Sequence, residues 1–296
     1  MQHLPRRSLV SFARSVAPWL MQPIDLLRYV NAWVLPRDLE GRDLTSFAPE
    51  TRLDLPGIDL QIPAQLERLE RWRLAYQQVF NALRCNPEIN TLHPGKPYMH
   101  NGYYPTPDAE VYAALIGDYR PGSIVEIGSG YSTRIARFAL RNFGASCELV
   151  AIDPQPRADI VNIADRVINR MVEEVPPEVI LQIDRPLLFI DSSHITRSRG
   201  DIPYLFNTLI PQLSTGTLVQ VHDIYTPYDY PYIYQKRLYT EQYMLQALLA
   251  HASRYRIVFA THMMSREYTE SMRQAISPAI GMNNEYYGAS FWFEIV

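Results

Sequence analysis

The sequence predicts an α/β fold with a mostly parallel sheet of seven strands, preceded by a helical extension. Three observations predict it. Short apolar runs alternate with helical patterns from Pro105 onward, a glycine turn directly follows the first of these runs, and polar side chains directly follow several others. Strands that alternate with helices form a parallel sheet covered on both faces. The carboxyl ends of its strands meet along one edge, where ligands bind.

The composition is that of a globular protein. Of 296 residues, 47% are hydrophobic and 20% charged, and the formal net charge is −3. No block of Lys and Arg forms a basic stripe, so we expect no nucleic-acid partner. Cys85 and Cys147, the two cysteines, lack CxxC spacing, so we expect neither a zinc site nor a disulfide framework. A chain without disulfides is consistent with a reducing cytoplasm, which is the expected location. No apolar run of the sequence is long enough to span a bilayer.

Residues 1–100 are expected to form a mainly helical N-terminal extension. Basic and apolar residues intermix before the first acid, Asp25, which predicts an amphipathic helix. We expect this helix to pack on the main domain; a weak contact with a membrane surface is the alternative. Further helices are predicted at 26–34 and 64–83, and a proline-rich loop at 35–63.

Residues 101–296 are expected to form one α/β domain. Thr106 is predicted to cap its first helix, with Pro107 at the first helical position and the end at Pro121-Gly122. Further helices are predicted at about 131–143 and 241–251. Strands are predicted at 123–127, 149–152, 166–169, 187–190, 217–221, 256–260 and 290–296.

A glycine turn links the first predicted strand to the next helix, in the segment IVEIGSGYST at 124–133. Gly128 permits the sharp turn, and Gly130 lets a ligand approach the backbone. The start of the helix, at Tyr131 and Ser132, offers unpaired N–H groups that suit a carboxylate or a phosphate. A dinucleotide fingerprint wants a small residue at position 133, where Thr133 fits poorly.

Asp153 ends the second predicted strand. An acid at this position accepts hydrogen bonds from ribose hydroxyls, which supports nucleoside binding without choosing between cofactors. The alternative role for Asp153 is a helix cap before Pro154.

Two further predicted strands end in titratable side chains. Asp191 and His194 follow the strand at 187–190, and His222 and Asp223 follow the strand at 217–221. If these strands are neighbours, the four groups converge on one site. Because adjacent residues of an extended strand point to opposite faces, His222 and Asp223 both reach that site only if the strand has already ended. Capping or core roles for each histidine are the alternative.

Tyrosine is concentrated after Asp223: seven tyrosines lie between Tyr225 and Tyr243. This segment is predicted to be either a substrate lid, whose aromatic faces pack on sugars or planar substrates, or a rigid cover of the core.

These segments resemble the class I methyltransferases that use S-adenosylmethionine (SAM), of the "methyltransferase domain 24" type. The likeness covers about residues 101–296, and the segments that carry it are NGYYPTPDAEVY, IVEIGSGYST, AIDP, LLFIDSSH, GTLVQVHDIYTPYDYP and EQYMLQALLA. It implies a Rossmann-like class I methyltransferase fold with SAM as the cofactor. The group is similar to enzymes that O-methylate sugars and natural products, some of which use magnesium.

The resemblance implies O-methylation of a hydroxyl on a sugar or other small metabolite. With the turn and helix start, it gives the expected cofactor-binding residues: Glu126, Gly128, Ser129, Gly130, Tyr131, Ser132, Asp153 and Asp191. It puts Asp191 and Asp223 at metal-binding positions, where related enzymes carry an Asp-Asp pair in place of His222-Asp223.

His194, His222 and Asp191 are the expected catalytic residues. A histidine base contributes roughly 10²–10⁴-fold to the rate. Alternatively, a divalent metal, Mg²⁺ or Mn²⁺, held by Asp191 and Asp223 lowers the pKa of the acceptor hydroxyl. A histidine ligand favours manganese, iron or zinc over magnesium.

Two other functions stay open: an NAD(P)-dependent oxidoreductase, and a SAM-binding protein without turnover. The expected partner is a small-molecule or glycan acceptor, and homo-oligomerisation is a further expectation that the sequence leaves open.

Overall fold

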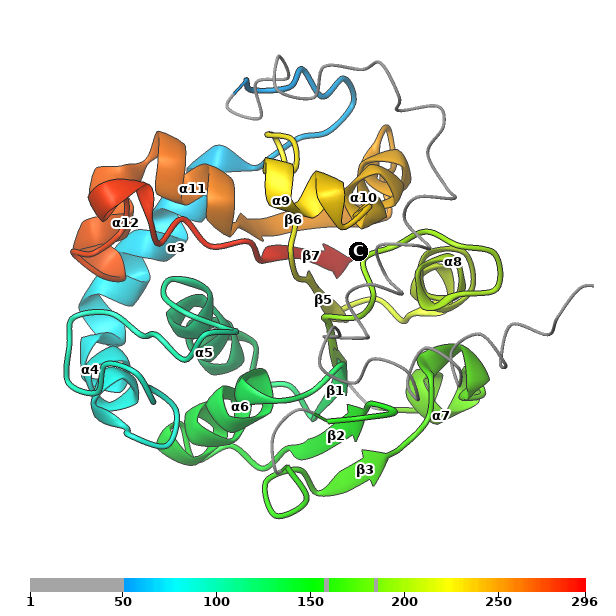
Figure 1. The fold of residues 1–296 in the computed structure, drawn as a ribbon, viewed down its shortest axis with the longest axis horizontal. Coiled ribbons are helices and arrows are strands. Elements are labelled where there is room, and N and C mark those ends of the chain that lie inside the picture. Colours follow the sequence, from blue (N-terminus) through cyan, green and yellow to red (C-terminus); the bar gives the residue numbers. More distant parts are fainter. Residues whose placement is uncertain (1–50, 157–159, 184–185) are drawn as a thin grey trace, which may run out of the picture. The chain divides into compact units, whose positions relative to one another are not determined.

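The computed structural model describes residues 51–156, 160–183 and 186–296 (Figure 1). The helices expected before residue 35 lie outside the described residues. The described part belongs to one compact unit, Pro49–Val296.

The seven-stranded sheet has the order β3-β2-β1-β4-β5-β7-β6. All neighbouring strands are parallel except β7, which is antiparallel to both β5 and β6. The predicted mostly parallel α/β fold is therefore confirmed. Its strands are β1 (Ser123–Ile127), β2 (Glu148–Ile152), β3 (Arg166–Ile168), β4 (Pro186–Ile190), β5 (Leu218–Val221), β6 (Tyr255–Ala260) and β7 (Phe291–Ile295).

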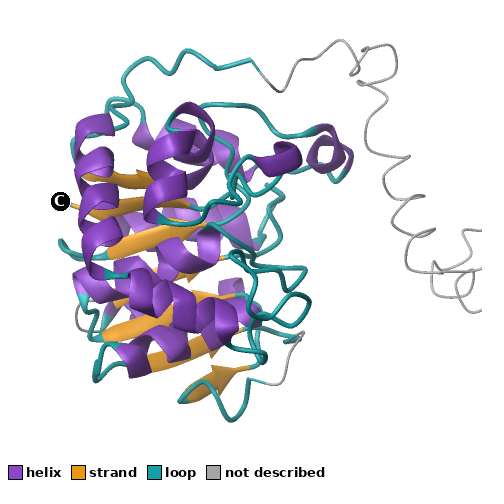
Figure 2. Ribbon diagram, turned by 90° about the vertical axis from the view of Figure 1, so that its left-hand side faces the viewer, coloured by secondary structure: helices purple, strands orange, loops and turns teal. Residues whose placement is uncertain are grey.

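Helices cover both faces of this sheet (Figure 2). Helices α5 (Asp108–Tyr119) and α6 (Tyr131–Asn142) lie on one face, and α7 (Glu178–Leu181), α8 (Asp201–Tyr204) and α10 (Glu241–Leu249) on the other (Figure 1). Because both faces are covered, every residue of β1, β4, β5 and β7 is buried. The other helices are α3 (Ile62–Ala75), α4 (Gln77–Cys85), α9 (Tyr232–Lys236), α11 (Thr261–Glu267) and α12 (Thr269–Ala275). Short 3₁₀ or π turns occur at Val172–Glu174, Leu205–Leu209, Ile210–Gln212 and Met282–Asn284.

The helix predicted at 64–83 is two helices, α3 and α4, that meet at Tyr76. The Tyr76 hydroxyl donates to Asp118 (3.0 Å), and its ring packs edge-on against Phe143 at 5.1 Å. These contacts with the α/β core accompany the break, and helical periodicity does not encode them.

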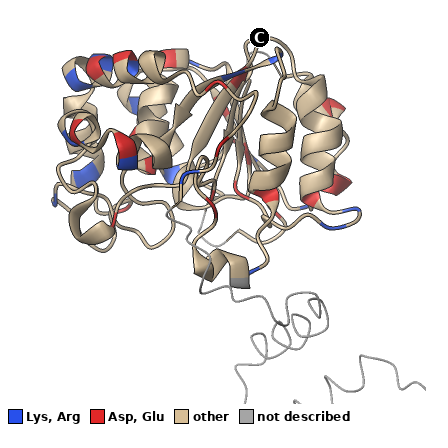
Figure 3. Ribbon diagram, turned by 90° about the horizontal axis from the view of Figure 1, so that it is seen from above, with Lys and Arg blue, Asp and Glu red and all other residues tan. Residues whose placement is uncertain are grey.

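The domain boundary differs from the expected one near residue 100, because α3 and α4 belong to the same compact unit as the sheet. Trp72 of α3 is fully buried, with its ring 5.0 Å from that of Phe259 in β6. Gln65 of α3 accepts a hydrogen bond from the Ala260 N–H (2.8 Å). The outer helices carry charges of both signs (Figure 3), such as the Arg73–Glu70 pair on α3.

The start of α5 also differs from the prediction. The helix begins at Asp108, and Pro107, not Thr106, is the capping residue. The Thr106 hydroxyl instead donates to the Glu110 carboxylate (2.8 Å) and accepts from the Met99 N–H (2.6 Å). The hydroxyl thus ties the preceding loop to α5.

Candidate functional site

The backbone hydrogen-bond ladder of the sheet continues one residue past the carboxyl ends of the strands. The N–H of Gly128 donates to β2, that of Asp191 donates to β1, and that of His222 donates to β4, at 2.8–3.0 Å. The first residue after each strand is thereby held at a common edge, as the sequence predicted.

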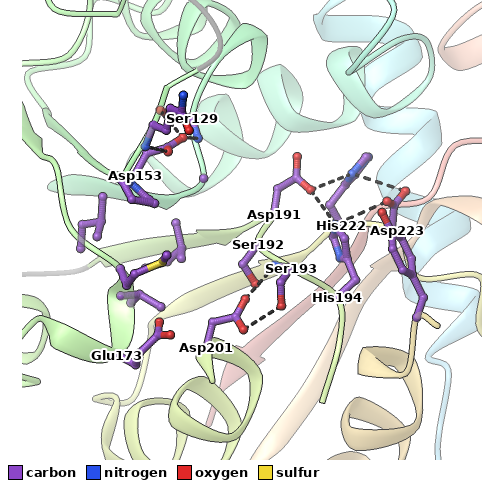
Figure 4. Close-up of a pocket in the computed structure, with 18 of the residues that line it drawn as sticks. Ser129, Asp153, Glu173, Asp191, Ser192, Ser193, His194, Asp201, His222 and Asp223 are labelled. Carbon is purple, nitrogen blue, oxygen red and sulfur yellow. Dashed lines mark hydrogen bonds and ion pairs between the residues drawn. The ribbon is translucent and has the colours of Figure 1, made fainter. Parts of the chain in front are cut away.

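A cavity of about 500 Å³ opens at this edge (Figure 4). Its wall includes Gly128, Ser129 and Asp153 on one side and the Asp191, His194, His222 and Asp223 group on the other. Ligand cavities commonly measure about 300–1,000 Å³. One cavity therefore joins the two groups of residues that the sequence singled out.

Gly128 is required where the turn passes the end of β4. Its φ is +81°, and a Cβ there would lie 2.0 Å from the carbonyl oxygen of Asp191. At Gly130 an added Cβ would meet no atom of the described chain within 4 Å. Gly128 therefore lets the turn approach the end of β4 closely. Of the two glycines in the turn, Gly130 is the one with open space beside its backbone.

Glu126 lies behind the turn and not on the cavity wall. It is fully buried in β1, where it accepts hydrogen bonds from the hydroxyls of Tyr112 (3.1 Å) and Thr133. The Thr133 hydroxyl also accepts from the Gly130 N–H (3.0 Å), so the residue at position 133 links the turn to Glu126. Burial raises the pKa of Glu126 to about 8, although its hydrogen bonds from Thr133 and Tyr112 lower it. Glu126 thus supports the turn from within the core.

Asp153 holds the turn from the cavity side. One carboxylate oxygen accepts from both the N–H (2.9 Å) and the hydroxyl (3.0 Å) of Ser129, and the other accepts from the Gln155 N–H (2.8 Å). Tyr131 and Ser132, which were expected to bind the cofactor, do not line the cavity. The ring of Tyr131 stacks on the ring of Tyr103 (5.8 Å, 15°), and Tyr103 does line the cavity.

The four titratable groups after β4 and β5 converge (Figure 4). Nε2 of His194 lies 3.2 Å from Asp191 and 3.5 Å from Asp223, and Nδ1 of His222 lies 3.6 and 3.7 Å from the same two carboxylates. Strand β5 ends at Val221, and Asp223 adopts a φ of +53°, so His222 and Asp223 reach one site. One ligand atom each from Asp191, His194 and Asp223 lie within 4.8 Å of one another, a spacing suited to a metal ion.

A second carboxylate lies behind each histidine. Nδ1 of His194 is 2.8 Å from Glu241, and Nε2 of His222 is 3.6 Å from Asp108. Burial lowers the pKa of both imidazoles, but the surrounding carboxylates, chiefly Asp191, raise it well above the usual value. Both histidines are therefore held in a strongly negative environment.

The sequence did not single out Glu241 or Asp108 as site residues: Glu241 was only the start of a predicted helix, and Asp108 lies just after the predicted cap of another. Their position at the start of a helix was visible, but neither is near its histidine along the chain. The separation between His194 and Glu241 is 47 residues, so only the tertiary fold brings the start of α10 to the residue that follows β4.

The tyrosine-rich segment serves two roles. Tyr225, Tyr228 and Tyr230 are buried, as expected for a rigid cover of the core. Tyr234 and Tyr239, further along, line the cavity. The alternative of a lid thus finds no support at the buried positions.

A family comparison agrees with this geometry. Residues 125–224 match the model of a family described as a methyltransferase domain. This segment is a class I methyltransferase domain. It contains the glycine turn and Asp153. It also contains the four titratable residues at the other side of the cavity, called the His–Asp cluster below: Asp191, His194, His222 and Asp223.

The chain is similar to a sequence relative and to several solved structures. An uncharacterized protein of Archaeoglobus fulgidus is 35% identical over 123 residues, which cover 40% of this chain and 53% of the relative, so the chain matches about half of that relative's length. Among solved structures, the O-methyltransferase of Bacillus cereus in complex with SAH is 17% identical, with 78% of this chain and 90% of that one covered and a TM-score of 0.39. The SAH-bound methyltransferase of Podospora anserina is also 17% identical, with 88% and 98% covered and a TM-score of 0.37. Within the described residues, no helix is both long and apolar enough to cross a membrane.

Proposed function

We propose that the chain is a SAM-dependent methyltransferase that O-methylates a hydroxyl of a sugar or another small metabolite. The observation that carries the proposal is the single cavity that joins a nucleoside-type turn to a His–Asp cluster. The match to a methyltransferase domain supports this proposal, since residues 125–224 include both the turn and the His–Asp cluster.

The cofactor half fits SAM. Ser129 and Asp153 line the cavity where the nucleoside would lie, and the space beside Gly130 is open to a close approach. Gly128, Glu126, Tyr131 and Ser132 would act by shaping the turn and the helix start. When bound, SAM supplies an electrophilic methyl group, so the protein must mainly align the acceptor and remove its proton.

We assign proton removal to His222. Its Nδ1 faces the cavity, and its nearest carboxylate oxygens are 3.6–3.7 Å away, beyond a normal N–H···O hydrogen bond. The surrounding carboxylates favour the protonated ring, and a cation held by Asp191 and Asp223 would offset them. The Nδ1 lone pair would then be available to a substrate hydroxyl, while Asp108 lies behind the ring. Histidine bases commonly contribute roughly 10²–10⁴-fold to the rate.

The residues also fit a divalent metal, Mg²⁺ or Mn²⁺. Asp191 and Asp223 would hold it beside the acceptor, where a bound cation lowers the pKa of a coordinated hydroxyl. His194 and Asp191 would then act on the acceptor through this site.

The outer wall of the cavity bears on the acceptor. Tyr234, Tyr239 and Arg237 line it, and the Arg237 guanidinium lies 5.5 Å from the centre of the Tyr234 ring. Aromatic faces pack on sugar rings. We therefore include sugars with anionic groups among the acceptors to be screened.

Further parts of the proposal concern location and partners. We assign the enzyme to the cytoplasm, where reducing conditions suit the unpaired thiols of Cys85 and Cys147. The proposed partner is the acceptor alone, without nucleic acid. A membrane contact through the N-terminal segment is tested by vesicle sedimentation, and homo-oligomerisation by light scattering.

The decisive experiment compares binding and turnover. Calorimetry with SAM and with NAD⁺ separates a methyltransferase from an oxidoreductase, and we expect binding of SAM alone. A radiolabelled methyl-transfer screen over nucleotide sugars, uronic acids, neutral glycans and phenols then identifies the acceptor. Asp191→Ala and His222→Gln should lose transfer at least 100-fold while SAM still binds; full activity in both variants would refute the roles of Asp191 and His222. SAM binding by the wild type without transfer to any acceptor would leave only a SAM-binding protein.

A further inference from the structure

We propose that His194 completes a three-ligand metal site with Asp191 and Asp223, and that Glu241 is a positioning residue that holds the His194 imidazole in its ligating orientation. The inference deepens the proposed function and rests on its metal site. It also selects the metal: a first-row transition ion such as Mn²⁺ in preference to Mg²⁺.

The spacing of the ligand atoms is that of a metal site. Nε2 of His194 lies 3.2 Å from Oδ1 of Asp191 and 3.5 Å from Oδ2 of Asp223. Nitrogen and oxygen ligands sit about 2.0–2.2 Å from such an ion, so adjacent ligand atoms are about 3.0–3.5 Å apart in octahedral or tetrahedral geometry. Two of the three pairs of ligand atoms are thus already at this spacing, and all three atoms lie within 4.8 Å of one another.

Glu241 determines which ring nitrogen faces the aspartates. Its carboxylate is fully buried and lies 2.8 Å from Nδ1 of His194. A carboxylate can only accept, so Nδ1 keeps its proton and Nε2 is the nitrogen that faces Asp191 and Asp223. A cation bound there would replace the proton on Nε2 and take its lone pair. Carboxylates that orient metal-binding histidines in this way typically contribute 10–100-fold to metal affinity.

The segment before Glu241 holds the same histidine by other contacts. The N–H groups of Thr240 and Glu241 both donate to the His194 carbonyl, at 2.8 and 3.2 Å. The Tyr239 ring packs 4.6 Å from the imidazole. His194 has a φ of +60°, an unfavourable conformation for a residue other than glycine that persists only where its surroundings enforce it.

The other histidine lacks such a device. Asp108 lies 3.6 Å from Nε2 of His222, and its two oxygens already accept the N–H groups of Ala289 and Ser290 at 2.8 and 2.9 Å. His222 is more than nine-tenths buried, yet its Nδ1 points at the aspartates without a hydrogen bond of normal length. The structure therefore separates a fixed ligand, His194, from the less constrained base, His222.

A mixed donor set decides the metal preference. Magnesium prefers oxygen ligands, whereas imidazole suits manganese, iron, cobalt and zinc. We expect Mn²⁺ to bind the SAM-free protein at least tenfold more tightly than Mg²⁺ in calorimetric titrations.

Three variants separate positioning from charge. Glu241→Ala and Glu241→Gln both remove one negative charge, but only glutamine retains an oxygen that accepts the Nδ1 proton. We expect Glu241→Ala to lose 10–100-fold in Mn²⁺ affinity and Glu241→Gln to recover most of that loss. Asp201→Asn is the matched control, because the buried Asp201 carboxylate bonds Ser193 and not His194. Equal losses in all three variants would reduce the role of Glu241 to general electrostatics and overturn its assignment.

Pulsed EPR of bound Mn²⁺ gives a spectroscopic test that survives misfolding of any Glu241 variant. We expect coupling to an imidazole nitrogen in the wild type and in His222→Gln, and its loss in His194→Gln. Nitrogen coupling that persists in His194→Gln, or its absence from the wild type, refutes the ligand assignment. These measurements need neither SAM nor acceptor. SAM binding without Mn²⁺ binding would therefore overturn only this inference. Mn²⁺ binding through His194 without SAM binding would overturn only the proposed function.

Discussion

Replacing Glu126 by glutamine should make the protein more stable, and the gain should grow with pH. The Glu126 side chain is fully buried, and burial raises its pKa to about 8 from an ordinary value of 4.5. Between these two pH values the unfolded chain carries an ionised Glu126, whereas the folded protein keeps it protonated. Ionisation therefore favours unfolding as the pH rises from about 4.5, and the penalty is complete above about 8.

The size of the effect follows from the shift. Each pH unit in this window lowers the free energy of unfolding by about 1.4 kcal/mol, so the wild type loses about 3 kcal/mol by pH 7. Glu126→Gln stays neutral and escapes this loss, while its amide oxygen still accepts from Thr133 or Tyr112. Its melting temperature should exceed that of the wild type by roughly 5–12 °C at pH 7 and equal it, within a few degrees, near pH 4.5.

Urea and thermal unfolding, followed by circular dichroism at four pH values from 5 to 8, measure the difference. The matched control is Glu110→Gln, which also removes a buried carboxylate but deprives Arg84 of its charged partner, 2.9 Å away in the wild type. This control should be less stable than the wild type at pH 7. If Glu126→Gln is destabilised by a constant amount at every pH, Glu126 is ionised in the folded protein and the reasoning fails.

Three further predictions concern the turn, the cofactor and the N-terminal helices. Gly128→Ala should unfold the domain or cost more than about 3 kcal/mol in urea unfolding, because its Cβ would meet a carbonyl at 2.0 Å, whereas Gly130→Ala should keep its melting temperature and lose SAM affinity; equal stability of both variants would contradict this. Asp153→Ala should weaken SAM binding about 10–100-fold in calorimetry, and Asp165→Ala, which removes a carboxylate bound to the N–H of the second residue of β2, should not; matching losses would deny Asp153 a direct role. Arg84→Met should lower the free energy of unfolding by about 3–5 kcal/mol, because it leaves the buried carboxylate of Glu110 without its charged partner. Much of this loss should be restored when Glu110 is also replaced by an apolar residue. An unchanged stability would show that α4 is not anchored by this pair.

Local patterns were sufficient for the strands and the turn. Short apolar runs bounded by glycine, proline and polar residues predicted β1, β2 and β4 to within one residue at each end, because strands buried on both faces require continuous apolar runs. The carboxyl ends of parallel strands share an edge, so Asp153, Asp191 and Asp223 could be expected together before any coordinates.

Helix boundaries depended on contacts between distant segments. The break at Tyr76 coincides with contacts to Asp118 and Phe143, and Thr106 lost its capping role to a bond with Glu110. Helical periodicity describes one face of one segment and carries no information about such partners.

The sequence alone determined the α/β architecture, the glycine turn and the set of polar residues at the rim of the sheet, because each depends on neighbours within a few positions along the chain. Only the tertiary structure decided that Glu126 lies inside the core and that Glu241 and Asp108 lie behind the two histidines. Those facts depend on how α5 and α10 pack beside the strands. The charge and orientation of a buried side chain are set by atoms close in space, and most of these are distant in the chain.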